Sequence, residues 1–309
     1  MKNVIGRLLA LIGTALLIAC VAGRFTYVKE GTLAPGKIRY AGVRSSGYGI
    51  RPFPQPGTWQ TAVKNVSAVL NGAAPCAVWI VGVLHSDRTS CRLEFPPDGR
   101  NLDHIVFSEE DKHEAYLDFF DSTGIKVYLQ VEPALAPVSE LIDLVLDRYG
   151  SHSCVVGFGV DVEWHRESER RDWGMPVSDD SACVWEYRVK THNPDYQLFL
   201  KHWDRKWMPK HFRGDILFLS DSQMLKGFDA MVQEFTRYWA DHFYPNDVGF
   251  QIGYGSDRAW WKPLCNPVGE IGRTIALNIR QKCSIFWVDF TLMEAILSQP
   301  EPTQRREGA

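Results

Sequence analysis

Residues 155–164 read VVGFGVDVEW, and this stretch decides the fold that the sequence predicts. A continuous apolar run of this length, ended by polar residues, is typical of a strand buried on both faces of a parallel sheet. Several other segments of the chain have the same character. They are 77–84 (AVWIVGVL), 126–132 (KVYLQVE), 215–219 (DILFL), 248–253 (VGFQIG) and 284–290 (SIFWVDF).

Segments with helical spacing of apolar residues separate these predicted strands. We expect helices at 58–70, 109–122, 138–149, 194–207, 224–243 and 267–280. Alternation of strand and helix argues for a parallel sheet covered by helices. A doubly wound sheet would normally carry a glycine-rich phosphate turn, but the sequence contains neither G-x-G-x-x-G nor a Walker motif. We therefore predict an α/β fold, a single-domain (β/α)8 barrel of the TIM type that spans 38–298.

The number of strands stays open at this stage. Either 38–43 or 49–53 supplies the first strand. Counting 104–107 gives eight strands; treating it as a loop gives seven, or eight again if both early segments pair. A chain of 309 residues is long enough for one barrel of about 250 residues with further segments at its ends.

Composition restricts the class of function. The chain has 34 Lys and Arg against 37 Asp and Glu, a formal net charge of -3. Proteins that bind nucleic acids usually carry a basic stripe, so a nucleic-acid partner is disfavoured. A content of 45% hydrophobic residues excludes a disordered chain. The unusual feature is the presence of 11 tryptophans.

The first 19 residues have the features of an export signal. A short basic region precedes 8–19, an apolar run too short for a comfortable transmembrane span of about 20 residues. Residues 17–20 (LIAC) resemble the bacterial lipobox, whose cysteine receives the lipid anchor. We expect a signal peptide at 1–19, lipidation of Cys20 with acyl chains such as palmitate, and anchoring in the cell membrane or outer membrane. An uncleaved anchor or a plain secretory signal is the alternative.

The ends of the mature chain and its cysteines complete the outline. We expect 20–37 to be a linker and 299–309 to be a disordered tail. Six cysteines remain after Cys20, and an even number in an exported protein permits disulfides with 15 full pairings. Buried free thiols are the alternative. The sequence has no C-x-x-C spacing, which makes a zinc or redox motif a weak interpretation.

In a barrel of this kind the active site is built at the C-terminal ends of the strands. The residues at or just after those ends are Glu132, Asp161, Glu163, Asp221, Gln251, Tyr254, Trp287 and Asp289. A buried carboxylate is costly unless it is paired, hydrogen-bonded or used in chemistry. A ring of carboxylates around one mouth therefore favours acid/base chemistry, although any single one could instead cap a helix or pair with a basic side chain.

Asp161 and Glu163 give the sharpest local signal. Residues two apart in a strand point to the same side, so both carboxyls are expected to face the barrel mouth. Two carboxyls in one poorly solvated site push their pKa values apart, which lets one stay protonated near neutral pH. Hydrolysis of a glycosidic bond needs such an acid together with a second carboxylate.

The run 156–163 (VGFGVDVE) resembles the D-G-x-D-x-D-x-E motif of the chitinase-like glycoside hydrolases of family 18. Gly157 matches the glycine of the motif, Asp161 its last aspartate and Glu163 its glutamate. The resemblance implies a (β/α)8 barrel with the motif on the fourth strand. It also implies that Glu163 is the acid/base and that Asp161 orients a substrate acetamido group, which serves as the nucleophile.

Other positions match the family less closely. Val156 and Gly159 stand where the motif has its first two aspartates. Gln251, Tyr254 and Trp287 are similar to the family's later substrate-contacting Gln/Tyr strand and its tryptophan on the last strand. The resemblance covers about eight residues, so it implies a distant relation within the barrel glycosidases.

Tryptophans divide into two predicted groups. Trp164, Trp260 and Trp261 follow predicted strands, and their flat rings suit stacking on sugar faces in a cleft. Trp173 and Trp185 fall in a predicted long loop at 165–193. The alternative for all of these loop tryptophans is packing beneath the loops. The core is the preferred place for Trp59, Trp79, Trp203, Trp207 and Trp239.

We therefore predict an exported, lipid-anchored glycosidase that acts on a polysaccharide or other glycan by acid/base catalysis, with Glu163 and Asp161 as the catalytic pair. No cofactor, metal or protein partner is expected. The alternative is a non-catalytic carbohydrate-binding surface lipoprotein on the same barrel, which the residues at 156 and 159 favour. A polysaccharide deacetylase would need a metal triad, and the histidines lack H-x-x-x-H and H-E-x-x-H spacing.

Overall fold

The computed structural model describes residues 33–34, 37–70 and 72–297. The predicted signal peptide 1–19, Cys20 and the predicted tail 299–309 lie outside the described residues, as does most of the predicted linker. No helix within the described part of the chain is long and apolar enough to cross a bilayer.

Eight parallel strands of the described chain close into a barrel. Strand β1 pairs with β10 on one edge and with β2 on the other, so the sheet has no free edge at this seam. This closure confirms the predicted (β/α)8 barrel, and the first strand comes from the earlier of the two candidate segments. The barrel strands are β1 (Ile38–Ser45), β2 (Ala74–Leu84), β5 (Lys126–Val131), β6 (Val155–Asp161), β7 (Gln197–Lys201), β8 (Ile216–Ser220), β9 (Val248–Ile252) and β10 (Cys283–Val288).

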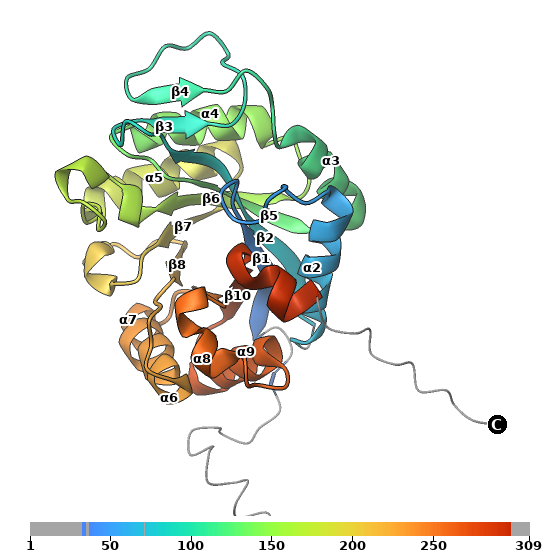
Figure 1. The fold of residues 1–309 in the computed structure, drawn as a ribbon. Helices are drawn as coiled ribbons and strands as arrows, with labels where there is room; N and C mark the ends of the chain where they lie inside the picture. The colour runs from blue at the N-terminus through green and yellow to red at the C-terminus, as the bar shows by residue number, and fades with distance from the viewer. Residues whose placement is uncertain (1–32, 35–36, 71, 298–309) are drawn as a thin grey trace, which may run out of the picture.

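Helices surround the strands on the outside of the barrel (Figure 1). Their apolar faces pack on the strands, as Trp59, Val63 and Val66 of the first helix do. They are α2 (Pro56–Ala68), α3 (Glu114–Thr123), α4 (Val138–Tyr149), α5 (Asp179–His192), α6 (Phe228–Val232), α7 (Asp241–Phe243), α8 (Arg258–Trp261) and α9 (Pro267–Asn278). A π-helical segment, Gln233–Ala240, joins α6 to α7, so the predicted helix at 224–243 is one helical run with a wider middle.

The prediction at 194–207 was wrong. This segment contains β7, followed by the short 3₁₀ helix η3 (Arg205–Trp207). The helix instead is α5, which lies where a long loop was expected. Only three residues of α5 are buried, and Val184 and Tyr187 are exposed on its outer surface, so its sequence lacks a clear apolar stripe.

Strands β3 (Cys91–Leu93) and β4 (Ile105–Phe107) resolve the uncertain strand count. Strand β3 pairs antiparallel with the end of β2, and β4 pairs with β3, so neither belongs to the barrel wall. They lie outside the ring at the top of Figure 1. The motif at 156–163 therefore begins on the fourth barrel strand, β6, and runs into the 3₁₀ helix η1 (Val162–Trp164).

Large side chains fill the interior of the barrel beneath its mouth. Tyr128, Phe199 and Phe286 belong to one buried cluster inside the ring of strands. Gly159 is required there, because a Cβ atom at this position would lie 1.9 Å from the Phe199 ring. The glycine at one motif position thus makes room for an aromatic side chain from the neighbouring strand.

The six cysteines after Cys20 are free thiols in the structure. Four of them are buried and two, Cys183 and Cys265, are exposed. Of the two possibilities left by the sequence, free thiols are the one found among the described residues.

Candidate active site

A buried lysine holds three carboxylates together at the C-terminal end of the barrel. Asp161 and Lys201 are the last residues of β6 and β7, where they are register partners, and Asp221 follows β8 directly. The Lys201 Nζ atom lies 2.9 Å from Asp161 Oδ2, 2.9 Å from Glu163 Oε1 and 2.6 Å from Asp221 Oδ2. Three carboxylates predicted from the ends of two strands, β6 and β8, are therefore joined by one cation.

Lys201 was missed by the sequence prediction. Its segment was assigned to a helix, so its position at a strand end was not recognised. The signal was present, because QLFLK at 197–201 is a short apolar run whose final residue is charged, like the other strand ends.

Glu163 differs from its two acidic neighbours in reaching a cavity. The side chains of Asp161 and Asp221 are 0% and 3% exposed, whereas that of Glu163 is 21% exposed. A cavity of about 610 Å³ opens beside Glu163, and Trp203 and Tyr238 form part of its lining. A molecule in this cavity can touch Glu163, while Lys201 and Asp221 lie behind it.

The electrostatics of this cluster separate the protonation states of its carboxyl groups. Burial, and next the charge of Asp221, raise the pKa of Glu163 well above its ordinary value although Lys201 opposes this. Burial also raises the pKa of Asp161 to about 7, with Lys201 acting against it. The pKa of Asp221 is lowered to about 2, since Lys201 and a hydrogen bond from Glu163 outweigh its burial. Glu163 therefore holds its proton more tightly than an ordinary glutamic acid, while the neighbouring Asp221 is ionised near neutral pH.

Lys201 itself stays protonated. Burial alone would lower its pKa, but the three carboxylates raise it well above the ordinary value. A protonated amine has no lone pair, so Lys201 is not suited to act as a nucleophile or to form a Schiff base. Its role in this arrangement is to neutralise buried negative charge.

Glu132, which follows β5, and Asp289, which follows β10, lie in a second polar network of the mouth. Asp289 Oδ1 accepts a hydrogen bond from Arg44 Nη1 at 3.2 Å, and its Oδ2 accepts from the backbone and hydroxyl of Ser46. Glu132 Oε1 accepts from the Tyr48 hydroxyl at 2.6 Å. These bonds give Asp289 a structural role. The sequence prediction missed Arg44, Ser46 and Tyr48, since the segment after β1 contains no carboxylate.

Gln251 and Tyr254 lie together in the barrel mouth. The Tyr254 hydroxyl donates to Gln251 Oε1 at 3.1 Å, and both side chains are buried. Gln251 Nε2 and Asp161 Oδ1 are buried without hydrogen-bond partners among the described residues.

The tryptophans are distributed differently from the prediction. Trp261 and Trp287 are fully buried and pack on each other, with their ring nitrogens bonded to Tyr254 O and Thr291 Oγ1. They do not line the cavity, because each is enclosed by the core of the barrel. Trp185 lies on α5 and is also buried. The predicted cleft residues Trp164 and Trp260 are half-buried, and neither lines the cavity beside Glu163.

Trp203, and not the tryptophans that were predicted for this role, lines the cavity beside Glu163. It follows β7 and lines the cavity beside Glu163, although the sequence prediction assigned it to the core. The ring of Trp173, 37% exposed, lies 4.3 Å from the Trp203 ring and extends this aromatic surface outward. The reason for the error is the same as for Lys201, since both residues stood in the segment mistaken for a helix.

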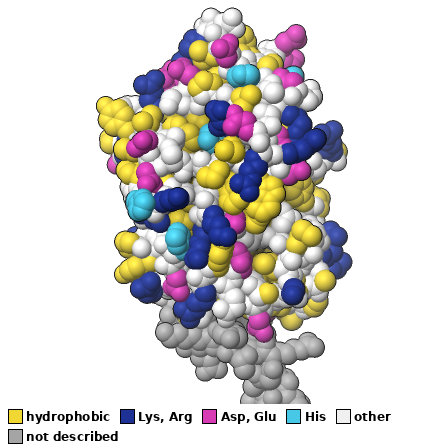
Figure 2. Space-filling view, turned by 90° about the vertical axis from the view of Figure 1, so that its left-hand side faces the viewer, with side chains coloured by type: hydrophobic (Ala, Val, Ile, Leu, Met, Phe, Trp, Pro, Cys, Tyr) yellow, Lys and Arg dark blue, Asp and Glu magenta, His cyan; other side chains and the backbone are white. Residues whose placement is uncertain are grey.

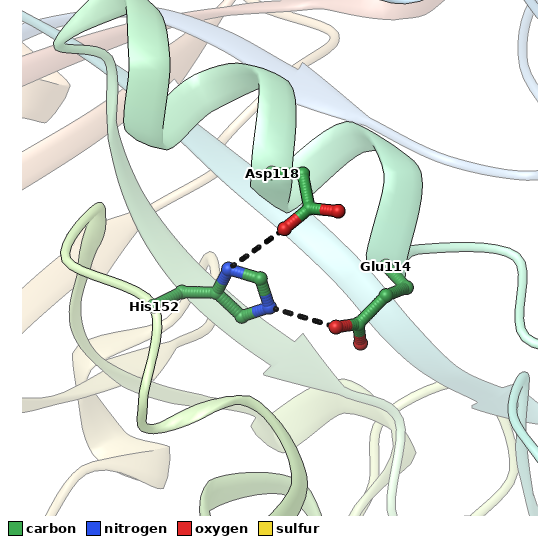
Figure 3. Close-up of side chains that lie close together, drawn as sticks. All are labelled: Glu114, Asp118 and His152. Carbon is green, nitrogen blue, oxygen red and sulfur yellow. Dashed lines mark ion pairs between the residues drawn. The ribbon is translucent and has the colours of Figure 1, made fainter.

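A group of possible metal ligands lies far from this mouth. Glu114 and Asp118 of α3 face His152, and their ligand atoms lie within 4.8 Å of one another (Figure 3). His152 precedes β6 and so lies at the opposite end of the barrel. Its Nδ1 is already 2.8 Å from Asp121 Oδ2, and both carboxylates of the group are exposed. The group is explained as a surface ion-pair network.

Comparisons with known proteins give distant similarity only. No protein-family model matches the chain, and no curated protein has a significantly similar sequence. A solved structure described as a candidate α-L-fucosidase from Bacteroides thetaiotaomicron is 11% identical, with a TM-score of 0.47 over 84% of this chain and 91% of that one. An intracellular xylanase from Thermoanaerobacterium saccharolyticum in complex with xylotriose is 11% identical, with a TM-score of 0.42 over 84% and 90% of the two chains.

Proposed function

We propose that the chain is a glycoside hydrolase that cleaves a polysaccharide at the cell envelope, with Glu163 as the general acid. The observation that carries the proposal is the state of Glu163 itself. Its carboxyl group has a pKa raised well above the ordinary value, lines a cavity of about 610 Å³ and is backed by Asp221 and Lys201. A general acid for a glycosidic oxygen needs a raised pKa and a position where it can reach the substrate; Glu163 has the raised pKa and lines the cavity.

The proposed step is protonation of the leaving oxygen. Glu163 transfers its proton to the glycosidic oxygen while the bond from that oxygen to the anomeric carbon breaks. Water supplies the hydroxyl group to the anomeric carbon and returns a proton to Glu163. The nearby charges of Asp161 and Asp221 stabilise positive charge that develops on the sugar, as in other two-carboxyl sites.

Asp161 is the proposed partner of Glu163 in two respects. Its Oδ2 atom accepts a hydrogen bond from Gln130 Nε2 at 3.2 Å and pairs with Lys201, which fixes the lysine beneath the acid. Its Oδ1 atom is buried without a hydrogen-bond partner among the described residues, directly behind Glu163. Trp203, with its ring in the cavity wall, supplies a face for a sugar ring.

Replacement of Glu163 tests the proposal. In Glu163→Gln, we expect hydrolysis of the cleaved glycan to fall by about 10²- to 10⁴-fold, because the amide cannot donate a proton in the same way. The assay is reducing-sugar release from chitin-like, peptidoglycan and other glycan substrates. An aryl glycoside with a good leaving group should restore much of the rate in Glu163→Gln, since its departure needs little protonation.

Glu169→Gln is the matched control, because Glu169 is an exposed glutamate in the same segment that pairs with Arg166. It should hydrolyse glycans like the unchanged protein. Equal turnover by Glu163→Gln and the unchanged protein would overturn the assignment of the acid. Glycan binding without turnover by either protein would select the alternative, a carbohydrate-binding barrel that does not catalyse.

We also propose that the chain is exported and anchored through lipidated Cys20. The support is the sequence of 1–20, with its apolar run and lipobox-like LIAC. In the bacterial host, labelled palmitate should be incorporated into the unchanged chain and into Cys183→Ser, which removes an exposed thiol elsewhere. Cys20→Ser should lose the label and leave the membrane fraction. Retention of label and membrane association by Cys20→Ser would refute lipidation at this position.

A further inference from the structure

We propose that a second cavity at the barrel mouth binds an acidic substituent of the glycan, so that the substrate is an anionic polysaccharide. The inference rests on the proposed function for the step from ligand to substrate. The cavity has a volume of about 480 Å³ and lies beside β1, β2 and β3, whereas the cavity beside Glu163 lies next to β7 and β8. The two cavities therefore occupy different sectors of one ring of strand ends.

Positive charge dominates the lining of this second cavity. Arg51, Arg92 and Lys112 line it together with a single carboxylate, Glu94, which leaves two positive charges in excess. Lys112 Nζ lies 2.7 Å from Glu94 Oε1 and Arg92 Nη2 lies 3.6 Å from the same atom. Arg51 is exposed and forms no ion pair with any residue that the structure describes. The chain as a whole is acidic, so this local excess is not a consequence of composition.

Two buried hydrogen-bond donors in the lining have no partner. His113 is 4% exposed, and its Nδ1 accepts a hydrogen bond from Trp79 Nε1 at 3.0 Å. Burial lowers the pKa of His113 to about 4, so the neutral ring carries its proton on Nε2. His113 Nε2 and Arg92 Nε are both buried without a hydrogen-bond partner among the described residues, although Glu94 Oε2 lies 3.7 Å from His113 Nε2. Unpaired donors beside excess positive charge fit an anion better than a neutral sugar hydroxyl.

Aromatic side chains in the same lining fit a sugar ring. Phe53 and Tyr116 are half-buried, and their rings meet edge to face at a centroid distance of 5.4 Å. Half-buried rings of this kind offer apolar faces to a pyranose, while the arginines bind its acidic group. A carboxylate or sulfate carried on a sugar matches this combination, since a free inorganic anion would not use the aromatic wall.

Tyr48 connects this cavity to the acid/base cluster. It lines the cavity, and its hydroxyl is bonded to Glu132 of the barrel mouth at 2.6 Å. Glu132 follows β5, which pairs with β6, the strand that ends at Asp161. A glycan chain lying across the mouth would thus reach from the basic cavity past Tyr48 to Glu163.

The face of the molecule on the left-hand side of Figure 1 carries further basic side chains. Figure 2 shows Lys and Arg side chains across the middle of this face, with Asp, Glu and hydrophobic side chains among them. The segments after β6 and β7, which contribute Glu163 and Trp203, lie on this side in Figure 1.

Binding measurements on the full chain test this proposal without relying on turnover. Glu163→Gln serves as the background, and the probes are oligosaccharides of equal length from a polyuronate, a sulfated galactan and an uncharged galactan. We expect one of the two acidic probes to bind at least about tenfold more tightly than the uncharged one by calorimetry, and to weaken with added salt. The identity of the tighter probe decides between carboxylate and sulfate.

Two variants locate the binding, and one controls for loss of charge. Arg51→Gln and Arg92→Gln should each weaken binding of the acidic probe about tenfold. Arg51→Gln removes an exposed side chain that forms no ion pair with a described residue, so we expect this variant to be as stable as the background protein. Arg273→Gln, on the exposed face of α9, should bind like the background protein. Equal affinity for the uncharged probe, or no effect of Arg51→Gln and Arg92→Gln, would overturn the proposal.

The outcomes also separate this inference from the proposed function. Hydrolysis of an uncharged glycan that Arg51→Gln leaves unchanged would keep the glycosidase and remove the anion site. Binding of an acidic probe that is lost in Arg51→Gln, with no hydrolysis of that glycan by the unchanged protein, would keep the anion site and overturn the glycosidase.

Discussion

At the scale of single residues, the feature that organises the mouth is Lys201. Three carboxylates within 2.6–2.9 Å of one ammonium group would repel one another without it. The lysine stabilises the ionised form of Asp221, and Asp221 in turn favours the protonated form of Glu163. Lys201 therefore helps to keep Asp221 ionised, and the charge of Asp221 favours the protonated form of Glu163.

Removal of this cation should cost stability in a pH-dependent way. We expect Lys201→Met to be about 3–5 kcal/mol less stable than the unchanged protein at pH 7.5, because it leaves buried carboxylates without a counter-charge. The depressed pKa of Asp221, about 2, contributes stability above its unfolded value that is lost as pH falls. In Lys201→Met that pKa rises, so the carboxyl takes up a proton sooner.

The difference in stability between Lys201→Met and the unchanged protein should accordingly shrink between pH 7.5 and pH 4.5. Urea unfolding at the two pH values measures it. Lys206→Met, at an exposed position in η3, should differ little from the unchanged protein at either pH. A loss of stability in Lys201→Met that is equal at both pH values would indicate a packing effect instead of an electrostatic one.

At the scale of elements, the sequence predicts the position of a strand correctly where that strand is a long apolar run. Strand β6 is such a run, and the pair Asp161 and Glu163 could be placed at its end without a structure. Strand β7 is only five residues long, with polar Gln197 and Lys201 at its ends, so its apolar signal is three residues. Tertiary burial, which the sequence does not display, makes all five residues of β7 part of the core.

Helix α5, which directly precedes β7, was also predicted wrongly, because a loop was expected at 165–193. Its N-terminus is capped by the Ser178 side chain, which accepts a hydrogen bond from Ser181 N, and this local signal was readable. The apolar stripe of α5 was too weak to be recognised in the sequence, since the helix buries only Ala182, Trp185 and Val189. The helix was predicted at 194–207 instead of 179–192, and for this reason Lys201 and Trp203 were left out of the predicted site.

At the scale of the whole molecule, the barrel depends on a seam between the two ends of the described chain. Strand β1 is hydrogen-bonded to β10 and β2 at once, so closure joins residues about 245 positions apart. Across this seam Asp289 binds Arg44 and Ser46, and all of its side chain is buried. The sequence does not show that β1 pairs with β10, so Asp289 could be recognised only as a further carboxylate at a strand end.

Asp289→Asn tests whether the seam stabilises the whole barrel. The amide leaves Arg44, which is 4% exposed, without its counter-charge, and an unpaired buried charge costs about 3–5 kcal/mol. We expect urea to unfold Asp289→Asn at lower concentration, with far-UV circular dichroism and tryptophan fluorescence shifting together. Asp103→Asn, at an exposed loop position, should unfold like the unchanged protein. A fluorescence transition that moves while the dichroism transition stays in place would mean that the seam supports only its surroundings, because loss of closure must release every strand of the ring.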